Sequence, residues 1–345
     1  MRAAVLHEWR GPLRLETRRV PTPRAGEVLV RVVACGLGLT IDTARSGAMG
    51  GTLPRVLGHE LAGEVVQAGD GAADWAPGDR VTGTFYLLCG SCDMCTGGRE
   101  TLCRDLRGFV GTAIDGALAE YVVLPAASLV AVPDDVRLDE AGIAADAVAT
   151  PYHVATKRAH IAAGDRVAVV GAGGGVGAQM VEVAKAFGAI VVAVERDAAK
   201  LARLGELAPH AIVDSSRPGW ADRLSEAAGG ELTAYIDFAA TQETLEAGPR
   251  AVGRGGIVVV VGFRPGVSLS LPPDRLIVDE IVVTGSRYAT RAEIAASLEL
   301  IAAKRIRPVI GARFPLEQAN EAMDAVAGNE IFGRALVTVA PESMR

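Results

Sequence analysis

The first third of the chain contains short runs of β-branched and other apolar residues that end at Gly, Pro or Asp. Residues 28–33 and 62–66 are runs of this kind, and residues 78–81 and 119–125 continue the pattern. Runs of this composition, bounded by turn-forming residues, are typical of β-strands. Helical spacing of apolar residues is scarce in this region. We therefore predict a β-rich domain over residues 1–150.

After about residue 150, apolar runs alternate with segments of helical spacing. Six runs are nearly continuous in apolar residues: 167–170, 190–194, 211–213, 234–238, 257–261 and 281–284. Helical spacing between these runs is clearest at 176–187 and 198–207. Strands without a polar face are buried on both sides, as in a parallel sheet covered by helices. We predict a doubly wound α/β domain over residues 151–289, which binds ligands at the carboxyl ends of its strands.

The last segment, residues 290–345, carries two more helical patterns and two short strands. We predict helices at 291–303 and 316–327, a strand near Val309 and a last strand at 335–339. Because this segment follows the α/β domain, we expect it to return to the first domain.

Composition and charge exclude two classes of protein. The chain has 35 Lys and Arg against 41 Asp and Glu, a formal charge of −6, and no extended basic run. A nucleic-acid-binding surface is therefore not expected. The longest stretch without a charge, residues 167–181, has 15 residues, whereas a bilayer span needs about 20 apolar ones. With no secretory signal at its start, we expect a cytoplasmic protein without a membrane partner.

The run at 167–170 leads directly into the glycine-rich segment GAGGGVG, after which a helix is predicted. Counted from Ala172, the segment reads A-x-G-x-x-G. Small residues at these positions let backbone amides approach a pyrophosphate at a helix N-terminus. We predict that the cofactor contacts of this turn are made by Ala172, Gly174, Gly175, Val176 and Gly177.

An acidic residue follows the turn at the distance expected for a dinucleotide site. Glu195 ends the second strand, 18 residues after Gly177, where a carboxylate hydrogen-bonds the ribose 2′-hydroxyl. A carboxylate repels the 2′-phosphate of NADP, so Glu195 favours NAD(H) over NADP(H). Arg196 and Lys200 weaken this preference, because either side chain could reach a phosphate.

The four cysteines in the segment 89–103 are the most specific feature of the sequence. Cys89, Cys92, Cys95 and Cys103 have a spacing that suits four thiolates around a tetrahedral Zn²⁺ with no open position. Such a closed site is structural. Disulfides, unrelated buried thiols and an iron–sulfur cluster are alternatives, but nothing else in the sequence indicates an oxidising compartment or an iron–sulfur protein. We predict one structural zinc per chain.

These residues resemble the zinc-type alcohol dehydrogenases of the medium-chain dehydrogenase/reductase (MDR) superfamily over essentially the whole chain. The resemblance rests on Gly58-His59-Glu60, the four-cysteine segment, the glycine-rich turn and Thr150-Pro151-Tyr152-His153. It implies a GroES-like β-rich catalytic domain, a Rossmann domain and a C-terminal return to the first domain. It also implies a homodimer or homotetramer that pairs the last Rossmann strands, here residues 281–284.

The family uses a second zinc ion, and the resemblance assigns it His59, Glu60 and Asp146. In the family motif C-G-x-C-H-[ST]-D, the second cysteine is also a ligand, but Gly38 stands at that position here. Thr40 matches the hydroxyl that relays the proton. The three remaining ligands could hold a weaker zinc or another divalent ion, since sites with three protein ligands exist. Alternatively, they form a metal-free polar pocket.

The resemblance also assigns residues to the cofactor. Thr150 resembles the family residue that packs on the nicotinamide, and Arg334 resembles the C-terminal arginine that reaches the pyrophosphate. Backbone at the predicted strand ends provides further contacts at Phe238, Val261, Gly262, Gly285 and Ser286. The A-x-G-x-x-G form of the turn resembles the zinc-independent quinone and enoyl reductases of the superfamily.

Hydride transfer needs a nicotinamide held against the substrate and a group that stabilises charge on the substrate oxygen. We therefore predict an NAD(P)-dependent oxidoreductase that interconverts a small carbonyl compound and an alcohol. Without zinc, Thr40 and His59 would have to polarise the carbonyl. One alternative is a zinc-independent ene-reductase of α,β-unsaturated carbonyl compounds, which Gly38 favours. A second alternative is a non-catalytic dinucleotide-binding scaffold, against which Thr40, His59 and Asp146 argue.

Overall fold

The computed structural model describes residues 1–340 of the 345-residue chain. These residues form two compact units, one made of residues 1–149 with residues 289–340 and the other of residues 150–288. In the part of the chain that the structure describes, no helix is both long enough and apolar enough to cross a membrane.

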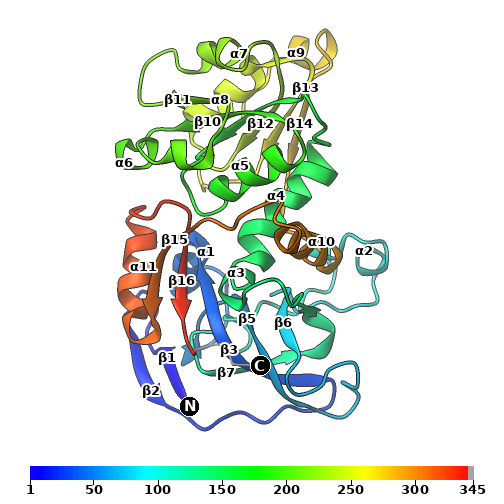
Figure 1. The fold of residues 1–345 in the computed structure, drawn as a ribbon, viewed down its shortest axis with the longest axis vertical. Coiled ribbons are helices and arrows are strands. Elements are labelled where there is room, and N and C mark those ends of the chain that lie inside the picture. Colours follow the sequence, from blue (N-terminus) through cyan, green and yellow to red (C-terminus); the bar gives the residue numbers. More distant parts are fainter. Residues whose placement is uncertain (341–345) are drawn as a thin grey trace. The chain divides into compact units, whose positions relative to one another are not determined.

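The unit of residues 150–288 is built on one parallel sheet of six strands (Figure 1). The strand order β11-β10-β9-β12-β13-β14 places the first strand in the middle, so the chain winds to one side and then to the other. This confirms the predicted doubly wound α/β class. The strands are β9 (Arg166–Val170), β10 (Ile190–Glu195), β11 (Ala211–Asp214), β12 (Leu232–Asp237), β13 (Val252–Val260) and β14 (Val282–Gly285).

Helices connect these strands and bury the apolar faces of the sheet. Trp220, Leu224 and Tyr235 belong to a core cluster that also includes valines of β10. The helices are α5 (Gly177–Ala186), α6 (Ala198–Leu201), η5 (Leu204–Leu207), η6 (Ala221–Arg223), α7 (Leu224–Ala227), α8 (Gln242–Ala251) and α9 (Pro273–Ile277).

One predicted helix of this unit is wrong in its extent. The segment 198–207 forms the short helix α6 and then the 3₁₀ helix η5 rather than one continuous helix. Three-residue spacing in a 3₁₀ turn places Leu204 and Leu207 on the same side, and both are buried. Ala208 then adopts a left-handed conformation with φ of 44°, which ends the segment.

The other unit contains a three-stranded and a seven-stranded sheet. The smaller sheet has the order β2-β1-β4, and the larger has the order β15-β16-β3-β5-β6-β8 with β7 also paired to β3. The strands are β1 (Arg2–Leu6), β2 (Leu13–Thr17), β3 (Glu27–Leu37), β4 (Arg55–Val56), β5 (Glu60–Ala68), β6 (Arg80–Gly83), β7 (Tyr121–Pro125), β8 (Leu129–Ala131), β15 (Ile310–Pro315) and β16 (Arg334–Thr338).

The C-terminal segment joins this sheet, with β16 antiparallel to β3 (Figure 1). Asn320 on α11 donates to and accepts from the backbone of Leu13, at 2.9 and 2.8 Å. The remaining helices are α1 (Leu39–Arg45), α2 (Asp93–Thr96), η1 (Glu100–Leu102), η2 (Ala126–Ser128), α3 (Leu138–Ala141), η3 (Ala144–Val148), α4 (Ala149–His153), η4 (Val154–Arg158), α10 (Arg291–Ala302), η7 (Leu316–Gln318) and α11 (Ala319–Ala327).

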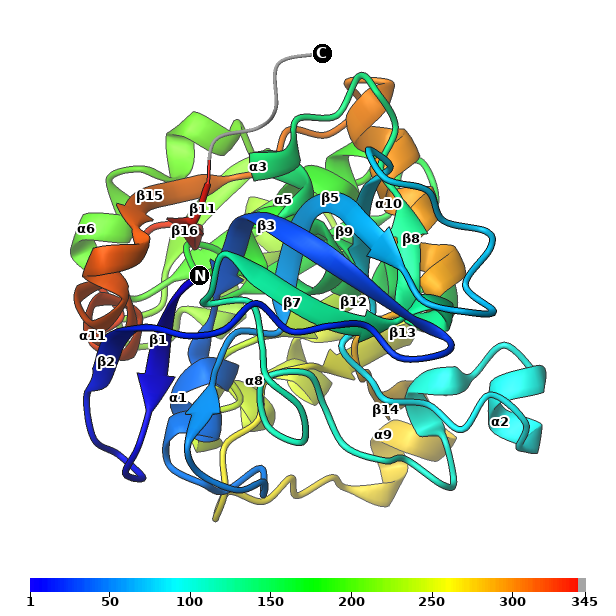
Figure 2. The same cartoon turned by 90° about the horizontal axis from the view of Figure 1, so that it is seen from below.

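The segment 89–103 forms a separate lobe of this unit. Figure 2 shows the loop that carries α2 extending away from the sheet, on the side opposite β1 and β2. Buried Glu100 of the lobe accepts a hydrogen bond of 2.7 Å from the backbone N–H of Arg291, the first residue of α10. This contact ties the lobe to the body of the unit.

Candidate active site

A buried cluster of charged side chains lies where β3, β5 and β16 pair. The register of β3 places Gly36 opposite Glu60 and Leu37 opposite Ala335. Glu60 and Arg334, each the first residue of its strand, are thereby brought together. Asp146 joins them from the π-helical turn η3. The relative exposure of Glu60, Arg334 and Asp146 is 0%, 3% and 3%.

The Arg334 guanidinium binds both carboxylates. Its Nε donates to Glu60 Oε2 at 2.8 Å, and its Nη2 lies 2.7 Å from the same oxygen. Nη2 also donates to Asp146 Oδ2 at 2.8 Å. Buried charges are tolerated only when they are paired and hydrogen-bonded, and Arg334 pairs with both carboxylates.

The electrostatics of Glu60 reflect this balance. Burial raises the pKa of Glu60 to about 6, although the Arg334 guanidinium and the backbone N–H of Ala147 oppose the shift. That N–H donates to Glu60 Oε1 at 2.8 Å. Burial lowers the pKa of Arg334, but the two carboxylates more than offset it, so the net shift is upward. Arg334 therefore stays cationic.

Gly38 provides the space that the guanidinium occupies. A Cβ built on Gly38 would lie 2.0 Å from Arg334 Nη1 and 2.4 Å from its Cζ. A side chain at position 38 therefore requires the Arg334 guanidinium to move. The backbone of Gly38 is extended and precedes α1, which carries half-buried Thr40 in its first turn.

His59 lies beside the charged cluster against an aromatic wall. Its Nε2 is 3.6 Å from Asp146 Oδ2, the oxygen that also accepts from Arg334. This nitrogen is buried and makes no hydrogen bond within residues 1–340. The imidazole packs on Phe85 with ring centroids 4.6 Å apart. A cavity of about 10 Å³ borders both rings. His59 thus offers a polar atom without a hydrogen bond, between the charged cluster and the Phe85 ring.

The residues around Asp146 do not fit a metal ion in this arrangement. Glu60 Oε2 and Asp146 Oδ2 face a guanidinium, and Gly38 supplies no ligand atom. Among the described residues, donor atoms gather as for a metal only in the cysteine lobe. Of the two possibilities that the sequence leaves open, this arrangement favours the metal-free polar pocket.

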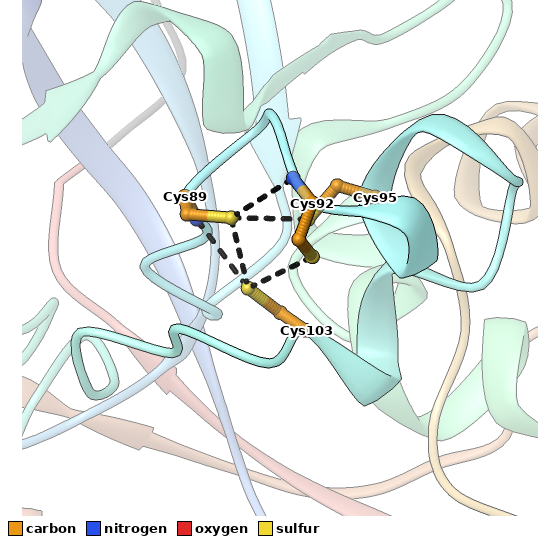
Figure 3. Close-up of side chains that lie close together, drawn as sticks. All are labelled: Cys89, Cys92, Cys95 and Cys103. Atoms are coloured by element: carbon orange, nitrogen blue, oxygen red, sulfur yellow. Dashed lines mark hydrogen bonds between the residues drawn. The ribbon is translucent and has the colours of Figure 1, made fainter.

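The four cysteine sulfurs converge in the lobe (Figure 3). Cys103 Sγ lies 3.5 Å from Cys89 Sγ and 4.0 Å from Cys92 Sγ, and Cys89 Sγ is 3.9 Å from Cys95 Sγ. Tetrahedral zinc with Zn–S bonds of about 2.3 Å separates its sulfurs by roughly 3.8 Å. Backbone N–H groups of Ser91 and Cys92 lower the pKa of Cys89 to about 6, which favours the thiolate. The residues present therefore fit a four-sulfur zinc site.

In the other unit, the glycine-rich turn follows β9 and opens α5. Gly171 has a φ of 78°, which favours glycine. A Cβ on Gly177 would lie 2.0 Å from the carbonyl oxygen of Gly171, so the turn closes only with glycine there. Val176 precedes the first residue of α5. These features fit the pyrophosphate of a dinucleotide at the start of the helix.

Glu195 lies beside this turn at the end of β10. Its Oε2 accepts from the backbone N–H of Gly173 at 3.0 Å, and its Oε1 accepts from those of Arg196 and Asp197 at 2.8 and 3.2 Å. Lys200 is buried nearby. Burial lowers its pKa, while Glu195 and Asp197 oppose the shift. Arg196 is exposed.

The strand-end residues lie in register along the carboxyl edge of the sheet. The N–H groups of Phe238, Val261 and Ser286 donate to carbonyls of the preceding or neighbouring strands, and that of Gly262 shares the acceptor of Val261, the carbonyl of Asp237. Gly285 ends β14. Thr150 is buried on α4.

Sequence reasoning missed Asp237 at this edge. Its Oδ1 accepts from the N–H groups of Ala239 and Ala240 at 2.8 and 2.9 Å, and its Oδ2 accepts from Thr244 Oγ1 at 2.7 Å. These bonds hold Ala240 at a φ of 46°. An acid at the end of an apolar strand, just before a turn, was the available signal.

Two family models match the chain. The model for the alcohol dehydrogenase GroES-like domain matches residues 24–134. The model for zinc-binding dehydrogenases matches residues 175–303. The first match covers His59 and Glu60, and the second covers the end of the glycine-rich turn and Glu195. Asp146, Arg334 and the first glycines of the turn lie outside both matches.

Individual relatives extend over nearly the whole chain. An alcohol dehydrogenase from Geobacillus stearothermophilus is 32% identical over 98% of this chain and 100% of its own. An acryloyl-coenzyme A reductase from Metallosphaera sedula is 32% identical over 94% of this chain and 96% of its own. The solved structure of an NAD-dependent alcohol dehydrogenase is 30% identical, covers 99% of this chain and 100% of its own, and superimposes with a TM-score of 0.90.

Proposed function

Because this chain belongs to the zinc-type alcohol dehydrogenases of the MDR superfamily, we propose that it interconverts a small carbonyl compound and an alcohol with NAD(H) rather than NADP(H). The protein is an oxidoreductase, as its relatives are. When bound, the nicotinamide donates or accepts the hydride. The observation that carries the cofactor choice is the fixed carboxylate of Glu195.

The preference for NAD(H) rests on the contacts of Glu195. Three backbone N–H groups hold its carboxylate beside the glycine-rich turn, so it cannot swing away from a 2′-phosphate. Like charges at a binding site cost several kcal/mol. The remaining cofactor contacts are proposed for Thr150, Ala172, Gly174, Gly175, Val176, Gly177, Arg196, Lys200, Phe238, Val261, Gly262, Gly285 and Ser286.

The substrate oxygen would be met by Thr40 and His59. Thr40 carries a hydroxyl that can pass a proton to or from the oxygen. His59 offers the buried Nε2 that makes no hydrogen bond within the described chain. In the direction of carbonyl reduction, the hydride adds to the carbonyl carbon, the C=O π pair moves to the oxygen, and the proton arrives through Thr40.

The cysteine lobe would hold one zinc ion with a structural role. All four ligand positions of a tetrahedral ion are filled by Cys89, Cys92, Cys95 and Cys103, which leaves none for a substrate. These four cysteines form no disulfide, which is usual in a reducing compartment, and on this basis we propose a cytoplasmic location. We propose a homodimer or homotetramer paired through β14.

One observation favours a second function, reduction of an α,β-unsaturated carbonyl compound. Position 38 carries no metal ligand, and hydride addition to the β-carbon with protonation of the α-carbon needs no metal. The acryloyl-coenzyme A reductase among the relatives is consistent with this chemistry. The relatives taken together favour the alcohol and carbonyl reaction.

A substrate panel tests the proposal. Purified protein is assayed for NADH oxidation with saturated aldehydes and ketones and with matched enones of the same carbon skeleton. We expect turnover of saturated carbonyls, and Thr40→Val should lower kcat while Thr43→Val, on the same helix, leaves it unchanged. Turnover of enones alone would establish the ene-reductase instead. Tight NADH binding with no turnover in either panel would indicate the non-catalytic scaffold.

A further inference from the structure

The guanidinium of Arg334 has one nitrogen that the charged cluster does not use. Nε and Nη2 donate to Glu60 and Asp146. Within residues 1–340, Nη1 donates no hydrogen bond to protein, and it is the nitrogen that lies closest to Gly38. Nη1 therefore fills the space where a side chain at position 38 would begin, with an unused donor.

The same carboxylate oxygen connects Arg334 to His59. Asp146 Oδ2 accepts from Nη2 at 2.8 Å and lies 3.6 Å from His59 Nε2. Arg334 Nη2 and His59 Nε2 thus both approach Asp146 Oδ2. Gly38 and Glu60 border the same guanidinium. His59, Glu60 and Asp146 are the residues that the family resemblance assigns to a second metal ion.

We propose that Arg334, admitted by Gly38, takes the place of the catalytic zinc. The guanidinium neutralises Glu60 and Asp146, and Nη1 donates a hydrogen bond to the substrate carbonyl oxygen. A guanidinium keeps its positive charge at all physiological pH values. It can stabilise negative charge on the oxygen during hydride addition without losing a proton, as preorganised donors do. Arg334 and Gly38 act together, because the guanidinium in its observed place leaves no room for a side chain at position 38.

This inference rests on the proposed function for its substrate, but its first test needs no substrate. Zinc is measured per chain by mass spectrometry of purified protein. We expect one zinc in the wild type, held by the cysteine lobe. We expect two in Gly38→Cys/Arg334→Ala, because that variant removes the competing cation and adds a thiolate to His59 and Asp146.

The matched control is Gly38→Ala/Arg334→Ala, which clears the same space without adding a ligand and should remain at one zinc. Two zinc ions in the wild type would overturn the inference. It would also be overturned if the cysteine-containing double variant, folded by circular dichroism, stayed at one zinc. Neither result depends on whether a carbonyl substrate is turned over, so failure of the proposed function is detected separately.

The second test is a double-mutant cycle on activity with the substrate found in the panel. Gly38→Ala and Arg334→Ala should each lower kcat/KM by about 100-fold, as the loss of one donor to a developing oxyanion does. Gly38→Ala in the Arg334→Ala background should add little, because the clash at 2.0 Å has been removed. Additive effects would contradict the proposed pairing of the two residues.

The Arg334→Ala variant also distinguishes a contact of Arg334 with the substrate oxygen from a contact with the cofactor pyrophosphate. If Arg334 binds the substrate oxygen, Arg334→Ala lowers kcat and leaves the Kd for NADH within about threefold. Guanidinium chloride added at millimolar concentration should restore part of the rate to that variant. A large increase in the Kd for NADH with unchanged kcat would overturn the inference and support the pyrophosphate contact.

Discussion

At the scale of single residues, backbone N–H groups fix the position of the Glu195 carboxylate. Glu195 combines low exposure with three backbone hydrogen bonds, so its carboxylate cannot rotate out of the turn. Lys200, buried next to it, partly offsets its charge. The exposed Arg196 is free of these constraints. Cofactor choice should therefore respond to Glu195 more than to its basic neighbours.

We predict that Glu195→Ala shifts the cofactor preference towards NADP(H). The ratio of kcat/KM for NADH to that for NADPH should fall at least about tenfold, which corresponds to roughly 1.4 kcal/mol of removed repulsion. Steady-state kinetics with both cofactors measure the ratio. Glu206→Ala is the control, since Glu206 pairs with Arg203 on the exposed side of η5. An unchanged ratio in Glu195→Ala would contradict the assignment of Glu195 to the ribose.

Only some residues of the charged cluster could be predicted from the sequence. His59 and Glu60 follow from a local motif, and Asp146 follows from its distance to Thr150. The role of Arg334 does not follow, because it is 274 positions from Glu60 and meets it only through the pairing of β16 with β3. The missing side chain at Gly38 was visible in the sequence. That the Arg334 guanidinium occupies the space beside Gly38 was not visible in the sequence.

At the scale of elements, the cysteine lobe is too short to be stable on its own secondary structure. Its helices α2 and η1 have four and three residues, whereas isolated helices in water need about 12–15. Zinc can supply the missing stability by joining both ends of the segment. The Glu100–Arg291 contact then depends on the folded lobe.

We predict that removal of zinc unfolds the lobe locally. In Cys95→Ser, trypsin should cut after Arg99, inside the lobe, and after Arg104, which directly follows it, before it cuts elsewhere. The zinc content should fall by one per chain. Limited proteolysis followed by mass spectrometry identifies the sites. Cys35→Ala is the control, because Cys35 is buried on β3 and burial holds its pKa far above the usual value. Resistance of zinc-free Cys95→Ser to trypsin would show that the lobe is stable without metal.

The strands β9 and β10 of the α/β unit were predicted closely, and the reason is physical. Strands β9 and β10 consist almost entirely of buried apolar residues, and this pattern predicts strands that are buried on both faces of a sheet. In the split α6–η5 segment, both a helix and a 3₁₀ turn bury Leu204 and Leu207, and apolar spacing does not distinguish them. The strand β3 was predicted too short, because residues 34–37 (Ala, Cys, Gly and Leu) contain no β-branched or aromatic residue, although all are buried.

At the scale of the whole molecule, the two edges of the six-stranded sheet differ. Both β11 and β14 pair on one side only among the described residues. Next to β14, Leu276, Ile277 and Val278 are exposed by 43%, 76% and 68%, and Val282 of the strand itself by 48%. Exposed apolar residues beside an unpaired edge mark an interaction surface. β11 exposes the single apolar residue Ile212. The edge at β14 is therefore the one expected to pair with a second copy.

We predict that Val282→Asp converts the oligomer to smaller species. The substitution places a charge on the β14 edge that is expected to pair with a second copy, and an unpaired charge buried there is strongly unfavourable. Light scattering after size-exclusion chromatography measures the mass. Ile212→Asp is the matched control, since Ile212 has similar exposure, 44%, on the opposite edge of the same sheet, and should leave the mass unchanged. Equal dissociation by both variants would indicate general destabilisation. If Val282→Asp keeps the wild-type mass while folded, the chain does not pair through β14.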